Sequence, residues 1–199
     1  MHDTVVGLVL GAGLSTRLGR PKQSLVLGDT TLLGWVVREA QRSSLARVVV
    51  VVGDAAVADG VAAVPGRVTV VRNEAPESGC VSSLKVGLDA AEPCDALMLL
   101  LGDMPGADAA VIDEVLAAGD RSTIAVAEYR DGVGHPFVFP AATFPVLRAL
   151  HGDKAVWKLA AQARRVVVDR GLPRDVDTWD DYVEVCKSLG VIPQLQSVT

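Results

Sequence analysis

Residues 10–25, LGAGLSTRLGRPKQSL, combine glycines and cationic side chains directly after an apolar run. Gly11 and Gly13 have no Cβ, so the backbone there can approach a ligand closely. Arg17 offers a planar guanidinium to phosphate oxygens, and Lys22 offers a compact ammonium charge. This combination predicts a polyphosphate site. An ordinary glycine-rich turn with solvated basic side chains is the simpler alternative, and two cations so soon after a buried strand disfavour it.

Two common phosphate loops do not fit this segment. In a Walker A loop, four residues separate the glycine from the Gly-Lys pair, but Gly13 and Gly19 lie too far apart. Pro21 also lacks the backbone N–H that such a loop would use. A dinucleotide fingerprint needs a glycine where Thr16 stands, and an acid about 20 residues further on, whereas Asp54 comes much later. The segment therefore favours a different triphosphate loop.

The composition excludes several classes of protein. The chain has 199 residues, 50% of them hydrophobic, a formal net charge of −5 and a pI of about 5.2. Its basic residues are dispersed outside the opening loop, whereas a nucleic-acid binder usually has a basic face. No apolar run approaches the roughly 20 residues that span a bilayer, and no signal-peptide pattern is present. We expect a cytoplasmic protein with no nucleic-acid or membrane partner.

Short apolar runs alternate with helical patterns in the first part of the chain. Strands are expected at residues 5–10, 48–52, 68–72, 96–101 and 123–127, and helices at residues 32–42, 55–63, 82–91 and 109–118. The strands are continuously apolar, which indicates burial on both faces, as in a parallel sheet covered by helices. These repeated units predict an α/β fold, a doubly wound, mostly parallel Rossmann-like sheet with helices on both faces.

The pattern changes after Ala127. The segment EYRDGVGHPFVF predicts a small β-hairpin insertion around Asp131 and Gly132. Two helices, a strand and a last helix are expected at residues 143–150, at 154–163, at 165–168 and from 178. The last helix opens with TWDD, a capping-box pattern. Because no repeat or linker interrupts the chain, we expect a single domain over residues 1–199.

Asp103 follows the strand expected at residues 96–101. In a doubly wound sheet ordered 3-2-1-4, this strand lies beside the first, and ligands bind outside the carboxyl ends of the two. Asp103 should therefore face the glycine loop. A carboxylate beside a triphosphate needs a cation between them, which predicts Mg²⁺ at this position. The alternative is that Asp103 only caps the following helix.

Several segments together resemble a known family of nucleotidyltransferases. They are LGAGLSTRLGRPK, NEAPESGCVSSLKVGL, LLLGDMP, GHPFVF, GDKAVW and RDVDT, in that order along nearly the whole chain. The chain thereby resembles the nucleotidyltransferases of the molybdenum cofactor group, with the cytidylyltransferases as the most similar branch and the guanylyltransferases as a related one. Gly11, Leu18 and Met104 depart from residues usual in that branch, which leaves the base and the acceptor open.

The resemblance implies a reaction and roles for individual residues. The reaction is transfer of CMP from CTP, or of GMP from GTP, to the phosphate of a molybdopterin-type cofactor, with Mg²⁺ and with release of pyrophosphate. A client molybdoenzyme is a further possible partner. Arg17, Lys22 and Asp103 are the expected catalytic residues. Nucleotide contacts are expected from Leu10, Gly11, Ala12, Gly13, Arg17, Lys22, Asn73, Gly79, Ser82, Ser83 and Asp103.

The resemblance also divides the chain. Residues 1–128 are the expected nucleotide-binding half, residues 129–190 the acceptor-binding half and residues 191–199 a tail. His135 and Lys154 are the expected acceptor contacts, and Asp177, in RDVDT, is the expected second metal ligand beside Asp103.

Simpler explanations remain for some of these residues. Ser82 and Ser83 are good N-cap residues for the helix they open, and Asp177 can cap the last helix. His135 can be structural, and Lys154 can be a solvated residue at a helix start.

Other functions also remain open. They are GMP or CMP transfer to another small phosphorylated acceptor, a nicotinamide-dependent oxidoreductase, or a nucleotide-binding chaperone. The threonine at position 16 disfavours the oxidoreductase, and the combination of Arg17, Lys22 and Asp103 disfavours a pure binding protein.

Overall fold

A seven-stranded sheet forms the centre of the computed structural model, which describes residues 4–13, 18–62, 64–118, 122–152 and 154–194. The strand order is β5-β4-β1-β6-β8-β7-β9, and only β8 runs against its neighbours. The strands are β1 (Val5–Gly11), β4 (Arg47–Val52), β5 (Val68–Arg72), β6 (Ala96–Leu101), β7 (Ala125–Tyr129), β8 (Gly132–Pro140) and β9 (Arg164–Val167). The expected α/β fold and its 3-2-1-4 order are confirmed.

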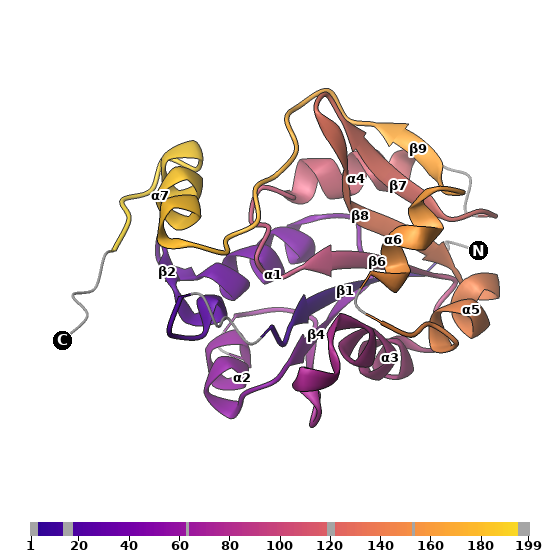
Figure 1. Ribbon diagram of the computed structural model, residues 1–199, viewed down its shortest axis with the longest axis horizontal. Helices are drawn as coiled ribbons and strands as arrows, with labels where there is room; N and C mark the ends of the chain where they lie inside the picture. Colours follow the sequence, from indigo (N-terminus) through magenta and orange to yellow (C-terminus); the bar gives the residue numbers. More distant parts are fainter. Residues whose placement is uncertain (1–3, 14–17, 63, 119–121, 153, 195–199) are drawn as a thin grey trace.

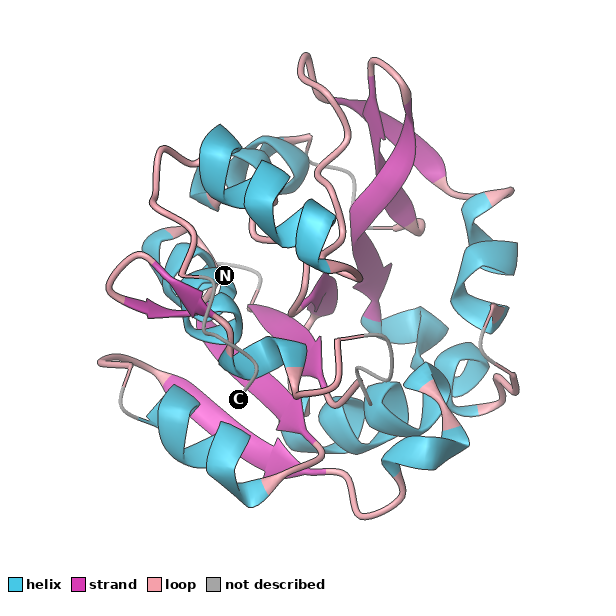
Figure 2. Cartoon of the chain, turned by 60° about the vertical axis from the view of Figure 1, so that its left-hand side comes forward, coloured by secondary structure: helices cyan, strands magenta, loops and turns pink. Residues whose placement is uncertain are grey.

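Helices cover both faces of this sheet (Figures 1 and 2). One face packs against α1 (Leu32–Arg42), α2 (Ala55–Ala62) and α4 (Ala109–Ala117). The other packs against α3 (Cys80–Ala91), α5 (Phe144–Arg148) and α6 (Ala155–Ala160). Neighbouring residues of each central strand enter opposite cores, as Val50 and Val51 do, because side chains alternate along a strand. This explains the continuously apolar strands.

A small peripheral region lies beside the sheet. The two-stranded hairpin β2 (Val26–Leu27) and β3 (Thr30–Thr31), which the sequence did not predict, packs with α7 (Trp179–Ser188) in a third apolar cluster. The Tyr182 hydroxyl donates to the Val26 carbonyl at 2.6 Å and accepts from the Gln194 amide at 3.0 Å. This α7 region, as we call β2, β3 and α7, thus ties the end of the described chain to the segment that follows the glycine loop.

Most predicted elements are confirmed, with shifted ends. The hairpin turns at residues 130–131, and its return strand is longer than expected because β8 pairs with both β6 and β7. The helix expected at residues 82–91 begins at Cys80. Thr178 and Asp181 form the expected capping box at the start of α7. No helix in the described residues is long and apolar enough to cross a membrane.

Candidate active site

The Lys22 ammonium lies between two carboxylates. Its Nζ is 2.5 Å from Oδ2 of Asp103 and 2.8 Å from Oδ1 of Asp177. The Lys22 side chain is only 11% exposed, against 21% and 36% for the two aspartates. Burial by itself lowers the pKa of Lys22, but the two carboxylates outweigh it and hold that pKa above its usual value. Three residues predicted from separate motifs thus meet at one point.

The sheet and the α7 region bring these residues together. Asp103 comes just after β6, where the Gly102 amide donates to the Leu10 carbonyl at 2.9 Å across to β1. Lys22 begins the 3-10 turn η1 (Lys22–Ser24), which leads into β2. The Val176 amide donates to the Asp103 carbonyl at 3.0 Å. This hydrogen bond holds the next residue, Asp177, close to the end of β6. The meeting point therefore lies at the topological switch point that the strand order predicts.

Neither aspartate has the capping role considered as its alternative. The N-cap of α4 is Asp108, whose side chain accepts from the Val111 amide at 2.9 Å, so the capping role considered for Asp103 is wrong. The N-cap of α7 is Thr178, so capping does not explain Asp177 either. Both carboxylates face Lys22 instead.

The donor atoms at this point suit a divalent cation. Two carboxylate oxygens converge on one cationic position, and such hard oxygen donors are the ligands that Mg²⁺ and Mn²⁺ prefer. The pKa of nearby Asp175 is raised to about 6 by partial burial and by the charges of Asp103 and Asp177. Within the described residues, no three acidic, histidine or cysteine side chains form a metal-binding group. A cation held here would take further ligands from elsewhere, as Mg²⁺ usually does from phosphates and water.

Two glycines of the glycine loop have different roles, one in packing against α1 and one at the site. A Cβ on Gly11 would come within 2.7 Å of a Leu33 methyl group, so this glycine makes room for α1. A Cβ on Gly13 would meet only ordinary contacts. The buried Gln23, which the sequence analysis missed, donates from Nε2 to the Gly13 carbonyl at 2.8 Å and fixes the loop. Arg17 lies outside the described residues, and its predicted role stays a prediction.

Asn73 organises the segment before α3. Its Nδ2 donates to the hydroxyls of Ser82 at 2.7 Å and Ser83 at 3.0 Å, and its Oδ1 accepts from the Ala75 amide. The Ser82 hydroxyl donates in turn to the carbonyls of Ala75 and Gly79. The alternative that the serines cap α3 is wrong, because the N-cap is Gly79, one residue before the first turn. The network fixes the loop that borders the site.

A cavity of about 540 Å³ opens beside Lys22. Among the predicted residues, the glycine-loop residues Leu10, Ala12 and Gly13 line it. So do Lys22, Asp103 and Asp177, together with Gly79, Ser83 and His135. Gly11, Asn73 and Ser82 are not in its lining. The sequence analysis missed several further lining residues, among them Gln23, Glu77, Cys80, Val156 and Trp157.

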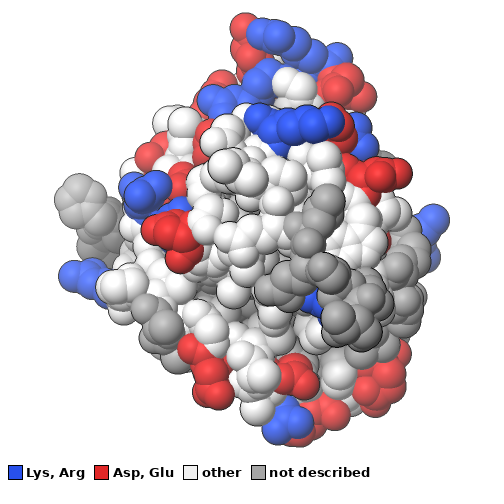
Figure 3. Space-filling model, turned by 90° about the vertical axis from the view of Figure 1, so that its left-hand side faces the viewer, with Lys and Arg blue, Asp and Glu red and all other residues white. Residues whose placement is uncertain are grey.

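The surface around this opening is mixed in charge. Figure 3 views the molecule from the side toward which β1 and β6 point in Figure 1. Acidic and basic side chains lie mostly around its edge, and uncharged ones occupy most of the middle. The described part of this face therefore has no broad basic patch of the kind that nucleic acids need.

The two predicted acceptor residues lie in different settings. His135 is buried, and its Nδ1 lies 3.3 Å from the Leu99 carbonyl, to which it can only donate. Burial lowers the pKa of His135 to about 4, so the ring is neutral at physiological pH. Its ring packs edge-on against Phe137 and Trp157 and borders the cavity. Lys154 is exposed at the start of α6, outside the cavity lining, and its role stays a prediction.

Comparison with known proteins identifies the family of this chain. A family model for the MobA-like NTP transferase domain matches residues 7–166. The chain belongs to this family. The match spans Lys22 and Asp103 and ends before Asp177. None of the curated proteins compared with this MobA-like chain matches it.

Solved structures extend the likeness to nearly the whole MobA-like chain. The crystal structure of the Rv0371c homologue from Mycobacterium sp. strain JC1 is 43% identical, with a TM-score of 0.82, over 94% of this chain and 96% of that one. A manganese complex of Rv0371c from Mycobacterium tuberculosis is 37% identical, with a TM-score of 0.77, over 93% and 99%. A CMP:2-keto-3-deoxy-manno-octonic acid synthetase complexed with CTP shares the fold, at 14% identity and a TM-score of 0.74, over 94% and 99%.

Proposed function

We propose that this MobA-like protein transfers CMP from CTP to the phosphate of a molybdopterin-type cofactor, with release of pyrophosphate. The observation that carries the proposal is the Lys22 ammonium held between Asp103 and Asp177 at the cavity beside the glycine loop. These groups suit phosphoryl-transfer chemistry, because such reactions depend on positioning and on neutralising phosphate charge. Membership of a family of NTP transferases supports it.

The triphosphate would lie along the glycine loop. Gly13 lines the cavity without a side chain, and the Lys22 ammonium would turn from the aspartates to the oxygens of the triphosphate. Arg17 would add a second positive charge from the same loop. Both cations would stabilise the leaving pyrophosphate.

The base would lie against the start of α3. Residues Glu77, Gly79 and Ser83 line that part of the cavity, and the Asn73 network holds them in place. The Ser83 hydroxyl accepts from Asn73, so its own hydrogen would be donated to an acceptor on the base. Cytosine offers such acceptors, and CTP appears in a protein of the same fold.

Asp103 and Asp177 would together hold Mg²⁺, as their oxygen atoms fit a hard divalent cation. The bound ion would neutralise charge on the phosphate oxygens. The manganese complex of Rv0371c supports a divalent cation in a relative of this chain.

The transfer needs no general base from the protein. An oxygen of the acceptor phosphate, already ionised at neutral pH, would attack the α-phosphorus of CTP, while the bond from that phosphorus to the pyrophosphate oxygen breaks. The buried, neutral His135 would then be a wall of the acceptor side and not a proton acceptor. Residues 129–190 supply that side, with Lys154 as a further candidate contact.

The proposal is tested by ligand-dependent unfolding and by turnover. With Mg²⁺ present, CTP should raise the melting temperature more than GTP or NADH does, since a ligand at 100 times its Kd stabilises the fold by about 2.7 kcal/mol. With a molybdenum-loaded pterin acceptor, pyrophosphate should be released from CTP. A larger shift with NADH and none with CTP would exclude the proposal, whereas turnover with GTP alone would correct the base.

A further inference from the structure

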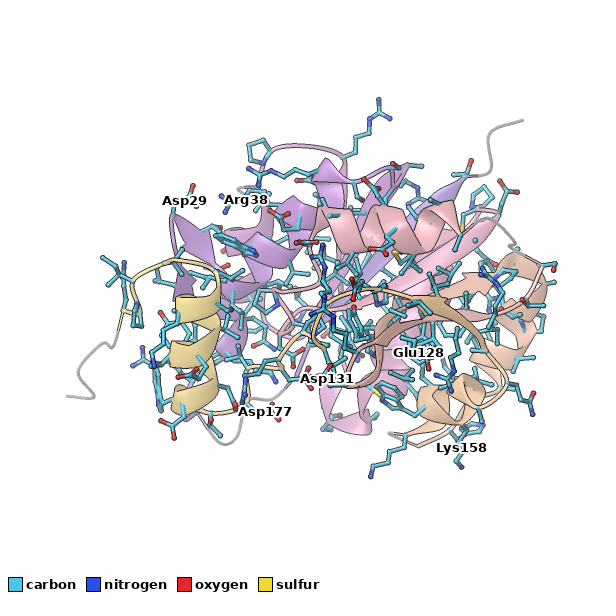
Figure 4. The ribbon with its side chains drawn as sticks, turned by 90° about the horizontal axis from the view of Figure 1, so that it is seen from above. Asp29, Arg38, Glu128, Asp131, Lys158 and Asp177 are labelled. Carbon is cyan, nitrogen blue, oxygen red and sulfur yellow. The ribbon has the colours of Figure 1, made fainter. Side chains whose placement is uncertain are left out.

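A second cavity, of about 370 Å³, adjoins the first. Leu101, His135 and Trp157 line both, so these three side chains form the boundary between the two cavities. The second cavity lies against the hairpin β7–β8 and the segment that leads from β9 to α7. Figure 4 shows Asp131 close to that segment and Asp177 at the start of α7. The proposed function places the acceptor on this side of the molecule but assigns no part of it to this second cavity.

Trp157 is held in a fixed orientation although it is exposed. It projects from α6 with 42% of its surface accessible, and Leu172, which also borders this cavity, is 38% exposed. The indole packs edge-on against His135, with centroids 5.5 Å apart, and against Phe137, at 5.3 Å. Both of those rings are buried in β8. The sheet therefore fixes the indole while part of its surface stays open to the cavities.

The second cavity combines apolar walls with carboxylate acceptors. Met104, Val133 and Leu172 contribute apolar surface. Asp131 and Asp175 contribute carboxylates, and Oδ1 of Asp131 already accepts from the Leu172 amide at 2.7 Å. Arg174, the cation in the described lining, is paired with Asp181 at 3.1 Å. Such a lining suits a flat ring with N–H donors better than a polyphosphate.

We propose that the second cavity binds the ring system of the acceptor, a flat heteroaromatic ring with N–H donors, and that Trp157 determines specificity by contacting its face. The proposal rests on the proposed function, since it concerns the acceptor of the same transfer. The segments that line this cavity also carry the reaction centre: Asp103 lies between Leu101 and Met104, and Asp175 precedes Asp177 by two residues. A ring bound here would therefore lie beside the segments that carry Asp103 and Asp177, so that the phosphate attached to the ring could reach the reaction centre.

Binding of a phosphate-free pterin tests the ring site without turnover. The probe is 6-hydroxymethylpterin, measured by calorimetry against the wild type, Trp157→Phe and Trp157→Leu. Trp157→Leu should weaken binding at least tenfold and Trp157→Phe by less, since phenylalanine keeps a smaller aromatic face. Val146→Ala is the control, because Val146 is 49% exposed on α5 and lines neither cavity. Unchanged binding in Trp157→Leu would overturn the proposal.

Two further measurements separate the ring site from the nucleotide site. Trp157→Leu should raise KM for the pterin acceptor while kcat and KM for CTP stay within about twofold. A rise in KM for CTP alone would assign Trp157 to the nucleotide and overturn the proposal. 2-Naphthalenemethanol, an uncharged flat ring without N–H donors, should bind the wild type at least tenfold more weakly than the pterin, and equal binding would contradict the role given to the carboxylates.

Failure of the proposed function gives a different pattern. If the wild type binds the pterin through Trp157 but releases no pyrophosphate from CTP or GTP, the result supports the ring site and contradicts the proposed transfer reaction. If CMP transfer proceeds and Trp157→Leu leaves both pterin binding and KM for the pterin unchanged, the result supports the transfer reaction and contradicts the ring site.

Discussion

The two carboxylates beside Lys22 come from regions of very different construction. Asp103 follows β6, a central strand between β1 and β8 whose side chains are buried on both faces of the sheet. Asp177 precedes α7, which packs on the short β2–β3 hairpin through a smaller apolar cluster. The first carboxylate is thus fixed by the main core, and the second by the periphery.

The site is therefore divided between the central sheet, which carries Asp103, and the α7 region. Lys22 leads into the same peripheral region as Asp177, because Leu25 and Leu27 pack in the cluster with α7. The ion pair between Lys22 and Asp103, with the Val176–Asp103 backbone hydrogen bond, joins that region to the sheet. Regions with small cores open at lower free energy than a central sheet does. The α7 region can therefore adjust to a ligand while Asp103 stays in place.

Asp103→Asn should have the largest effect on turnover. Asparagine keeps the size of the side chain but removes the charge that a divalent cation needs, so we expect kcat to fall about 10²- to 10³-fold, as when one electrostatic group is removed from an active site. The melting temperature of the ligand-free protein should change little. Pyrophosphate release at saturating CTP and Mg²⁺ measures the loss, and an equal rate in a folded mutant would exclude Asp103 as a metal ligand.

Asp177→Asn should have a smaller effect, because Asp177 is more exposed and its region can adjust. We expect turnover to fall by about tenfold to thirtyfold, because Asp177 contributes less than Asp103 to holding the metal ion. Higher Mg²⁺ concentrations should restore part of the loss. The same assay measures it. Equal losses in the two mutants would show that the construction of the two regions makes no difference to the site.

Lys22→Met removes the side chain that joins the two regions. The ammonium occupies the position on which both carboxylates converge, so it competes with a cation there. Without nucleotide, the mutant should bind Mn²⁺ about tenfold more tightly than the wild type, because the ammonium no longer competes with a cation for the two carboxylates. Lys158→Met, an exposed change on α6, is the control (Figure 4). Weaker or equal Mn²⁺ binding in Lys22→Met would contradict the idea that the ammonium and the cation compete for one position between the two carboxylates.

Tyr182→Phe should have the smallest effect. It removes the hydroxyl that bonds Val26 and Gln194, and a lost hydrogen bond of this kind costs about 1 kcal/mol. Amide hydrogen exchange should quicken in α7 and β2 and stay unchanged in β1 and β6. Faster exchange throughout the sheet would mean that the two regions unfold as one unit.

The sequence predicts the main sheet well because its signals are local. The apolar runs of β1, β4 and β6 and the glycine loop lie within short stretches, and strand order then places Asp103 at the switch point. The same reasoning predicts that Asp103 faces the glycine loop, but it does not predict the ion pair between Asp103 and Lys22.

Other parts of the site depend on contacts that no short stretch contains. The β2–β3 hairpin has two residues in each strand, too few for a periodic pattern, and is held by α7 across more than 150 positions of sequence. Gln23 and Trp157 carry no motif, and only the folded chain shows that they border the cavity. Gly11 illustrates the reverse case, because a glycine attributed to the ligand is required by Leu33.

Leu33 limits which substitutions are tolerated at two glycines near the site. Its methyl groups lie 2.7 Å from a Cβ built on Gly11 and 2.6 Å from one built on Gly102, the residue before Asp103. A mutation to alanine at either glycine would force the Leu33 side chain to move. At Gly102 the new Cβ would also lie 3.0 Å from the Leu10 carbonyl oxygen, so a smaller residue at position 33 would relieve the crowding at Gly11 more fully than at Gly102. The effects of mutations at positions 11, 33 and 102 should therefore depend on one another although the positions are 22 or more residues apart in sequence.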